Sequence, residues 1–526
     1  MVMKFKNHII VIIINLVIAL GFFISNLNVN YSDLSSDLLN IIPVAQKFDN
    51  PELFKNDLYL NDINNVRYYT PFYVQSLRFI AKFTNHNYLQ ALNVMSLICH
   101  FLFGVFWFFL IYRSISNFWI ALLVSILIRG IVWLPGLELW GISSLWSMMP
   151  RTLYIVFLPL PFLILSTSFF RLMLSALLLG LIFNFHPITG LGGILLFLVL
   201  VILVGIYYKQ EFKFNFKIFA YILIALVFGM LPFLSTYFAK TSALINYDIN
   251  VFNEIFKLRI PEYFSNPSLF LKQWLHIKTL FYVIPILGYH IISRSNRVQR
   301  KQSQVIILLT LSLIILPSIS VYVEQFINSI FNVNFRMSFQ LIRMQKVAVI
   351  PSFFAIAFLL KIVHERYNKY VLPSLFVGFT IIIFVCKHNV FKSVPFMGDD
   401  ILRHILPNKL SVGQVLPNTK LNVDKMASYI KVNTEQNALI YGSHVFRAAS
   451  NRSVILDSKG GSMLIEGNPN RFILWRQQQQ LLADAKTNDE KIKVLYDLDI
   501  DYVVSRIQNF NLEIVHRQGD LILYRL

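Results

Sequence analysis

Long apolar runs recur along the chain down to about residue 387, separated by polar connections. A helix needs about 20 mostly apolar residues to cross the hydrocarbon core of a bilayer. The pattern therefore predicts a polytopic α-helical membrane protein with about eleven transmembrane helices. The predicted spans are 8–26, 88–112, 117–134, 151–168, 172–185, 190–208, 218–238, 277–293, 304–323, 346–363 and 370–387.

After the last span the apolar runs become short and alternate with turn residues, which is typical of strands and short helices. About 110 residues are enough for a small α/β domain with its own core. Strands are expected at 438–441, 453–456, 501–504, 512–516 and 521–524, and helices at 424–432, 465–485 and 489–498. The predicted organisation is an N-terminal transmembrane helix (1–26), an extracytoplasmic loop with interface helices (27–87), a multi-helix transmembrane domain (88–387) and an extracytoplasmic α/β domain (388–526).

The charge distribution sets the expected orientation. The chain carries a net charge of +20, but only 14% of its residues are charged, against about 25% in soluble domains. Lysines and arginines gather in every second connection with few acids beside them, which is the positive-inside pattern of cytoplasmic loops. This pattern predicts a cytoplasmic N-terminus and an extracytoplasmic C-terminal domain, and it argues against a nucleic-acid partner.

The first long loop is acidic although the chain is basic. Between Leu27 and Val66 it has six carboxylates against two lysines, a local net charge of −4. Asp33 and Asp37 follow the first span directly, and a helix is predicted from Asp37 to Phe48. Such a carboxylate can act as a general base, or can hold a divalent metal ion with a sugar-phosphate donor. The competing interpretation is structural, because an acid in the first turn of a helix complements the helix dipole.

Several arginines are expected near the outer leaflet, where a bidentate guanidinium can bind a lipid phosphate. Arg129 is notable because it lies inside an apolar span, where ionisable residues are costly and usually functional. The alternative for each arginine is snorkelling to lipid headgroups, which requires no substrate. The candidates for substrate binding are Arg67, Arg129, Arg151, Arg336 and Arg343, with Lys346 close by.

His186 ends the fifth predicted span, and Pro187 and Gly190 interrupt the helix there. The imidazole can donate to a phosphate or take part in proton transfer, or it can simply be satisfied by neighbouring carbonyls. In the tail, Arg447, Arg452 and Lys459 lie near two successive glycines, which makes a weaker candidate for an anion site.

The layout of a first span, an acidic outer loop with interface helices, many further spans and an outer C-terminal domain resembles the GT-C superfamily of membrane glycosyltransferases. These enzymes include protein mannosyltransferases, oligosaccharyltransferases and aminoarabinose transferases, and they take a sugar from a polyprenyl-phosphate carrier. The stretch that best matches their first-loop carboxylate and helix is Asp37–Ala45, so the resemblance implies that Asp37 is catalytic and Asp33 is the second candidate. The usual pair of acids is absent, since Leu38 and Leu39 follow Asp37.

The sequence therefore favours a glycosyltransferase of the bacterial inner membrane that moves a sugar from a polyprenyl-phosphate carrier to an unidentified acceptor. The expected partners are membrane lipid and the lipid-linked sugar, and a divalent metal ion is an open possibility. Two alternatives stay open: a transporter or flippase for lipid-linked glycans, and a non-catalytic scaffold of the same shape.

Overall fold

The computed structural model of the protein describes residues 5–133, 138–142, 144–209, 215–239, 246–276, 279–331, 335, 337–366, 370, 373–375, 377, 421–506 and 510–526. Most of the predicted span 370–387 and the predicted domain start 388–420 lie outside this set. The chain forms two compact units. The helical unit comprises 1–26, 94–232 and 260–414, and the mixed unit comprises 27–93, 233–259 and 415–526.

The helical unit consists of apolar helices, as the hydrophobic runs predict. Six helices in the described part of the chain are long and apolar enough to cross a membrane, and three shorter ones are also apolar. The protein is therefore a polytopic helical membrane protein, while the exact number of spans stays a prediction. The long helices are α1 (Phe5–Ser25), α4 (Tyr88–Ile115), α9 (Pro187–Tyr207), α10 (Phe216–Phe238), α15 (Arg297–Phe331) and α17 (Ile350–Arg366) with the 3-10 turns of η9 (Ile342–Val349) before it.

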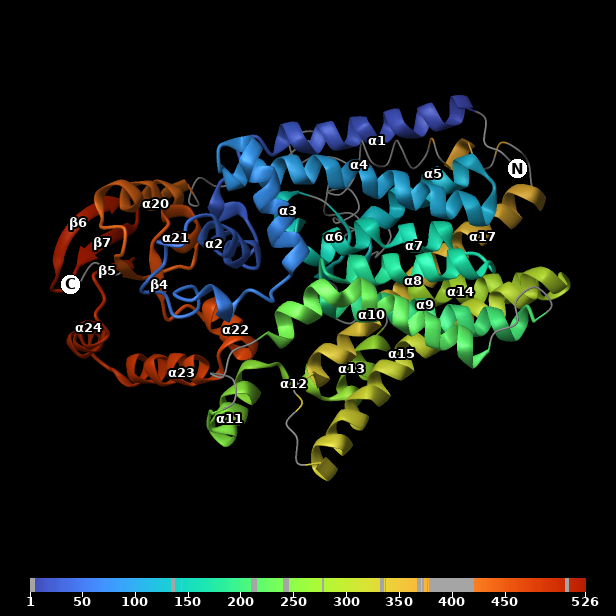
Figure 1. Ribbon diagram of the computed structural model, residues 1–526. Coiled ribbons are helices and arrows are strands. Elements are labelled where there is room, and N and C mark those ends of the chain that lie inside the picture. Colours follow the sequence, from blue (N-terminus) through green and yellow to red (C-terminus); the bar gives the residue numbers. More distant parts are fainter. Residues whose placement is uncertain are drawn as a thin grey trace. The chain divides into compact units, whose positions relative to one another are not determined.

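Shorter elements complete this unit (Figure 1). Prolines explain one difference from the expected spans, because Pro159 and Pro161 divide the predicted span 151–168 into two helices. These helices are α6 (Pro150–Phe157) and α7 (Pro159–Ile164). The remaining elements are α5 (Phe118–Leu127), α8 (Phe169–Phe183), α12 (Glu262–Ser265), α13 (Pro267–Trp274), α14 (Leu280–Ile292), α16 (Ser338–Leu341) and the strand pair β1 (Val132–Trp133) and β2 (Glu138–Leu139).

The mixed unit contains a five-stranded sheet in the order β4-β3-β5-β7-β6. β3 (Leu439–Tyr441) pairs in parallel with β4 (Ser453–Ile455) and β5 (Tyr502–Ser505), and β7 (Leu521–Arg525) is antiparallel to β5 and β6 (Glu513–Gln518). Five short strands were expected from the apolar pattern, and all five are present. The helices of this unit are α2 (Leu38–Asp49), α3 (Pro71–Ala81), α11 (Ile249–Arg259), α20 (Leu421–Asn433), α21 (Val445–Ser450), α22 (Ser458–Gly467), α23 (Pro469–Asp484) and α24 (Asn488–Asp497).

Both faces of the sheet are covered by helices, as parallel strands require (Figure 1). On one face Ile440 and Leu523 pack against Met426 and Ile430 of α20. On the other face Val503, Ile522 and Leu439 pack with Leu495 of α24.

The first loop folds together with the C-terminal strands, although the sequence suggested two separate segments. α2 packs on α21, and the Gln46 side chain donates to the carbonyl of Ala448 over 3.0 Å. The expected solvated face of α2 is absent, because every residue from Leu38 to Lys47 is buried. Lys47 is compensated by the carbonyls of Pro51 and Leu53, each 2.6 Å from its Nζ. A helix is present where one was predicted, and its position at the membrane interface stays a prediction.

Candidate functional site

In the helical unit, two glycines of α9 allow neighbouring elements to approach its first turns. A Cβ at Gly192 would lie 2.8 Å from the backbone oxygen of Met344 in η9. A Cβ at Gly193 would overlap the hydroxyl of Tyr154 in α6. Only glycine permits such close contacts, and they bring the flanking residues of η9 and α6 toward the start of α9.

The residue at that start is His186, which caps α9. The backbone N–H of Thr189 donates to its Nδ1 atom over 3.2 Å, and the Thr189 hydroxyl lies 2.8 Å from the same atom. Because Nδ1 accepts a hydrogen bond from the backbone, the ring proton is assigned to Nε2. The sequence left open whether neighbouring carbonyls satisfy this histidine, and the structure shows Thr189 as its partner.

Three cations act on His186. Burial, and then the positive charges of Lys346, Arg343 and Arg151, lower the pKa of His186 well below its usual value. The imidazole is therefore neutral near pH 7 and offers an N–H donor. We call Arg151, His186, Arg343 and Lys346 the cation cluster.

Aromatic rings hold two of these cations in place. The Nζ atom of Lys346 lies 4.5 Å from the ring centroid of Trp133, and the guanidinium of Arg343 lies 5.9 Å from the same ring and 5.1 Å from Phe264. Lys346 is only 1% exposed. Partly desolvated cations on fixed aromatic faces attract an anion more strongly than cations in water do. The cluster therefore has the chemistry to bind a phosphate or pyrophosphate group.

The cluster contains three of the predicted substrate-binding residues, and the others are placed differently. Arg129 is fully buried, and its guanidinium donates to Asn15 over 2.8 Å and to the carbonyl of His100 over 2.9 Å. This arginine thus joins helices α1 and α4. Arg67 is exposed in the mixed unit, and Arg336 lies outside the described residues.

In the mixed unit, Asp37 is the N-cap residue of α2, and its carboxylate accepts a bond from Lys459 Nζ over 2.9 Å. The Asp37 and Lys459 side chains are 40% and 38% exposed, so solvent can reach the pair. Asp33 instead closes a local turn, where its carboxylate accepts from the backbone N–H of Asn30 over 3.1 Å. Of the two predicted carboxylates, Asp37 therefore has the more open position.

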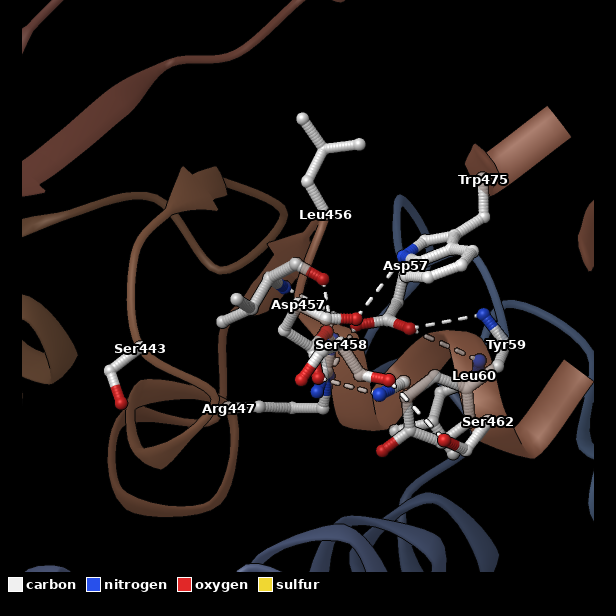
Figure 2. A network of polar contacts seen from close by, with 12 residues as sticks. Asp57, Tyr59, Leu60, Ser443, Arg447, Leu456, Asp457, Ser458, Ser462 and Trp475 are labelled. Atoms are coloured by element: carbon white, nitrogen blue, oxygen red, sulfur yellow. Dashed lines mark hydrogen bonds and ion pairs between the residues drawn. The ribbon is translucent and has the colours of Figure 1, made fainter. Parts of the chain in front are cut away.

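A buried ion-pair network in the same unit joins Arg447 to two carboxylates (Figure 2). Arg447 donates to Asp57 of the first loop and to Asp457 after β4, each over 2.6 Å. The ring of Tyr59 lies 4.7 Å from the guanidinium. Burial alone would raise the pKa of Asp457, but Arg447 and the Gly460 N–H hold that pKa below its usual value. The network therefore ties the first loop to the C-terminal strands.

The predicted anion site near the two tail glycines is wrong, because protein groups already occupy it. The Gly460 N–H donates to Asp457 over 2.6 Å, and Arg447 is committed to carboxylates. Arg452 donates to the carbonyls of Lys431 and Thr434.

The surroundings of Asp37 do not suit a divalent metal ion. An ammonium group occupies its carboxylate, and Asp33 is turned to its own backbone. No group of three or more His, Cys, Asp or Glu side chains gathers elsewhere in the described part of the chain. We therefore derive no step through a metal ion.

Sequence reasoning missed the role of Lys459 and of the Arg447 network. Their partners in the first loop, Asp57 of Arg447 and Asp37 of Lys459, lie 390 and 422 positions away in the chain, so no local spacing could reveal these contacts. The sequence contained a clearer indication for Lys346. This lysine is the first residue of the predicted span 346–363, and a lysine at the start of an apolar span is unusual enough to suggest a function.

No protein-family model and no curated protein matches the chain. Among solved structures, the chain is similar to the Archaeoglobus fulgidus oligosaccharyltransferase tethered with an acceptor peptide containing the NVT sequon. The identity is 12% over 95% of this chain and 69% of that chain, with a TM-score of 0.46. It is also similar to ArnT from Cupriavidus metallidurans bound to undecaprenyl phosphate, with 11% identity over 98% and 97% of the two chains and a TM-score of 0.49.

Proposed function

We propose that the protein is a GT-C-like glycosyltransferase that moves a sugar from a polyprenyl-phosphate carrier to an acceptor on the outer face of the membrane. The observation that carries this proposal is the cation cluster. Three positive charges act on one neutral N–H donor in a helical membrane unit, and a phosphate group is a chemically suitable ligand for such a set.

The apolar surroundings support a lipid-linked donor. A groove of about 500 Å³ in the helical unit is lined mainly by apolar side chains, among them Leu316, Ile319 and Val323 of α15. Leu341, two positions before Arg343, belongs to the same lining. We propose that this groove holds part of the apolar chain of the lipid donor.

Asp37 is the proposed general base. In the proposed step the acceptor hydroxyl gives its proton to the Asp37 carboxylate, and the acceptor oxygen forms a bond to the anomeric carbon. The bond from that carbon to the phosphate oxygen breaks, and the carrier leaves as polyprenyl phosphate with the electron pair. Positive charge beside this phosphate would stabilise the negative charge that develops on it. Asp33 is proposed only as a second carboxylate, because it is engaged in its own turn.

The charge asymmetry of the connections supports an inner-membrane protein with a cytoplasmic N-terminus. In that orientation the mixed unit, with Asp37, would be extracytoplasmic.

The first experiment measures binding of undecaprenyl phosphate to the full-length protein in lipid nanodiscs, with undecaprenol as the phosphate-free control. We expect Arg343→Gln or Arg151→Gln to weaken binding roughly tenfold, since a hydrogen bond to a charged group contributes about 1.5–3 kcal/mol. Arg171→Gln, at an exposed arginine in the first turn of α8, is the matched control and should bind as wild type. Equal binding of undecaprenol by the wild type would exclude phosphate recognition.

The second experiment tests the transferase itself by comparing glycolipid profiles in the native host. Wild type, Asp37→Asn, Asp33→Asn and a null strain are compared at equal membrane expression. We expect Asp37→Asn to reproduce the null strain and to accumulate a polyprenyl-phosphate sugar. A wild-type profile from both variants would remove the carboxylates from the mechanism and would favour a transporter or scaffold.

A further inference from the structure

The topology of the mixed unit gathers polar residues at one edge of its sheet. β3 and β4 are parallel neighbours, so their carboxyl ends lie side by side. His444 follows β3, and Asp457 and Lys459 follow β4. In α/β sheets this edge is where functional groups usually lie. Asp37, from the first loop, reaches the same edge through its bond to Lys459.

The buried network fixes the position of Lys459. Asp457 is held by Arg447 and also caps α22, because its carboxylate accepts from the Gly460 N–H. The carbonyl of Asp457 in addition accepts from the Trp475 indole over 3.1 Å (Figure 2). Lys459 is the second residue of α22, so its backbone is held on both sides. A lysine on such a support loses less freedom in forming an ion pair than a lysine on a mobile loop.

Asp37 is equally well supported from its own side. It stands at the start of α2, and the following residues from Leu38 to Lys47 are all buried. The two side chains therefore extend from rigid elements, and both remain accessible to a substrate.

We propose that Lys459 is a positioning residue for the transfer reaction, whose ammonium group holds and orients the Asp37 carboxylate. This inference rests on the proposed role of Asp37 as the base. A cation at 2.9 Å favours the charged form of a carboxylate, and the ionised form is the one that accepts a proton. Other charged and titratable groups at this edge are His444, Asp457 and Arg447, together with Arg259 of α11, which donates to the Ser458 carbonyl and interacts with Asp457.

The first test needs no enzymatic activity. The full-length protein in nanodiscs is labelled with a water-soluble carbodiimide across a pH series, and the labelling of Asp37 is followed by peptide mass spectrometry. Labelling requires a protonated carboxyl, so its midpoint reports ionisation. Lys459→Met should move this midpoint upward by about one pH unit, whereas Lys459→Arg should keep it. Lys493→Met, at an exposed lysine of α24, is the matched control.

The second test is the pH dependence of glycolipid formation in membranes of the complemented host. We expect Lys459→Met to shift the acid limb of the pH–activity profile to higher pH by the same amount. Lys459→Arg should give a profile close to that of the wild type. An unchanged midpoint and acid limb in Lys459→Met would overturn the inference. A shifted labelling midpoint together with no sugar transfer by the wild type would uphold the ion-pair effect and reject the proposed transferase instead.

Discussion

Arg447 binds Asp57 through a 2.6 Å ion pair, although 390 positions separate the two residues in the sequence. Arg447 is 1% exposed and the Asp57 side chain is fully buried. The same guanidinium also binds Asp457, so one cation compensates two buried carboxylates. Through this contact the segment that follows the first membrane helix becomes part of the C-terminal α/β unit.

Breaking this pair should destabilise the mixed unit. Arg447→Met leaves two buried carboxylates without their cation, and breaking one buried pair usually costs about 3–5 kcal/mol. Hydrogen exchange of β4 and of the segment around Asp57 should accelerate together, because both lose the same anchor. Arg506→Met is the control, since its partner Asp520 is 54% exposed and such pairs contribute about 0–1 kcal/mol. Equal protection in both variants would show that the buried pair does not stabilise the unit.

A side chain at Gly192 should destabilise the packing of α9 against η9 and should disturb the cation cluster, which includes two residues of η9. Ala at this position places a Cβ 2.8 Å from the Met344 carbonyl, so η9 must move. We expect Gly192→Ala to cost about 1–3 kcal/mol of stability and to weaken binding of undecaprenyl phosphate. At Gly288 the nearest atom to an added Cβ is 3.7 Å away, and Gly288→Ala should leave both properties intact. Thermal unfolding and lipid binding in nanodiscs measure the two effects, and a Gly192→Ala variant that binds as wild type would contradict the packing argument.

His444 should make the mixed unit less stable in mild acid. Burial, reinforced by Arg447 and Lys459 and opposed by Asp457, lowers the pKa of His444. The folded state therefore keeps this histidine neutral, and its contribution to stability is present above the unfolded pKa of about 6.5 and declines as the pH falls below it.

The fluorescence of Trp475, which bonds the Asp457 carbonyl, reports unfolding at this edge. We expect the unfolding temperature to fall between about pH 7 and 5, and to fall less in His444→Gln. Ser443→Ala changes the exposed neighbouring residue and should keep the wild-type slope. A slope unaltered by His444→Gln would assign the acid sensitivity to other groups.

Much of the fold follows from local pattern. The apolar runs predict the long helices, because a bilayer span requires an uninterrupted run whatever it packs against. The five strands of the tail are likewise read from short runs of β-forming residues between turns. At α2 the pattern predicts the helix but not the burial of its polar residues. Polar Asn40, Gln46 and Lys47 are buried there because α21 covers the helix and carbonyls compensate the lysine.

The candidate site was only partly predictable, for a different reason. Arg151, His186 and Arg343 could be chosen from residue type and expected depth, but their grouping depends on two glycines of α9 that set helix–helix distance. Arg129 has the same sequence signature, yet Asn15 and His100 occupy its guanidinium. Residue type alone cannot separate an arginine that joins two helices from one that lies in the cation cluster.

The two roles of His186, capping α9 through Nδ1 and donating a hydrogen bond through Nε2, can be tested separately. Asparagine is a good N-cap residue, so His186→Asn should keep the start of α9 and the unfolding temperature while removing the Nε2 N–H. We expect this variant to bind undecaprenyl phosphate roughly tenfold more weakly, as for the loss of one bond to a charged group. His186→Asp, which also caps the helix but adds a negative charge, should bind more weakly still.

The pH dependence of binding tests which form of the imidazole acts. The ratio of wild-type to His186→Asn affinity should stay constant from about pH 8 to 6, since the lowered pKa of His186 keeps the imidazole neutral there. A ratio that grows as the pH falls would mean that the imidazolium form binds the phosphate, and an unchanged affinity of His186→Asn would leave His186 as a cap alone.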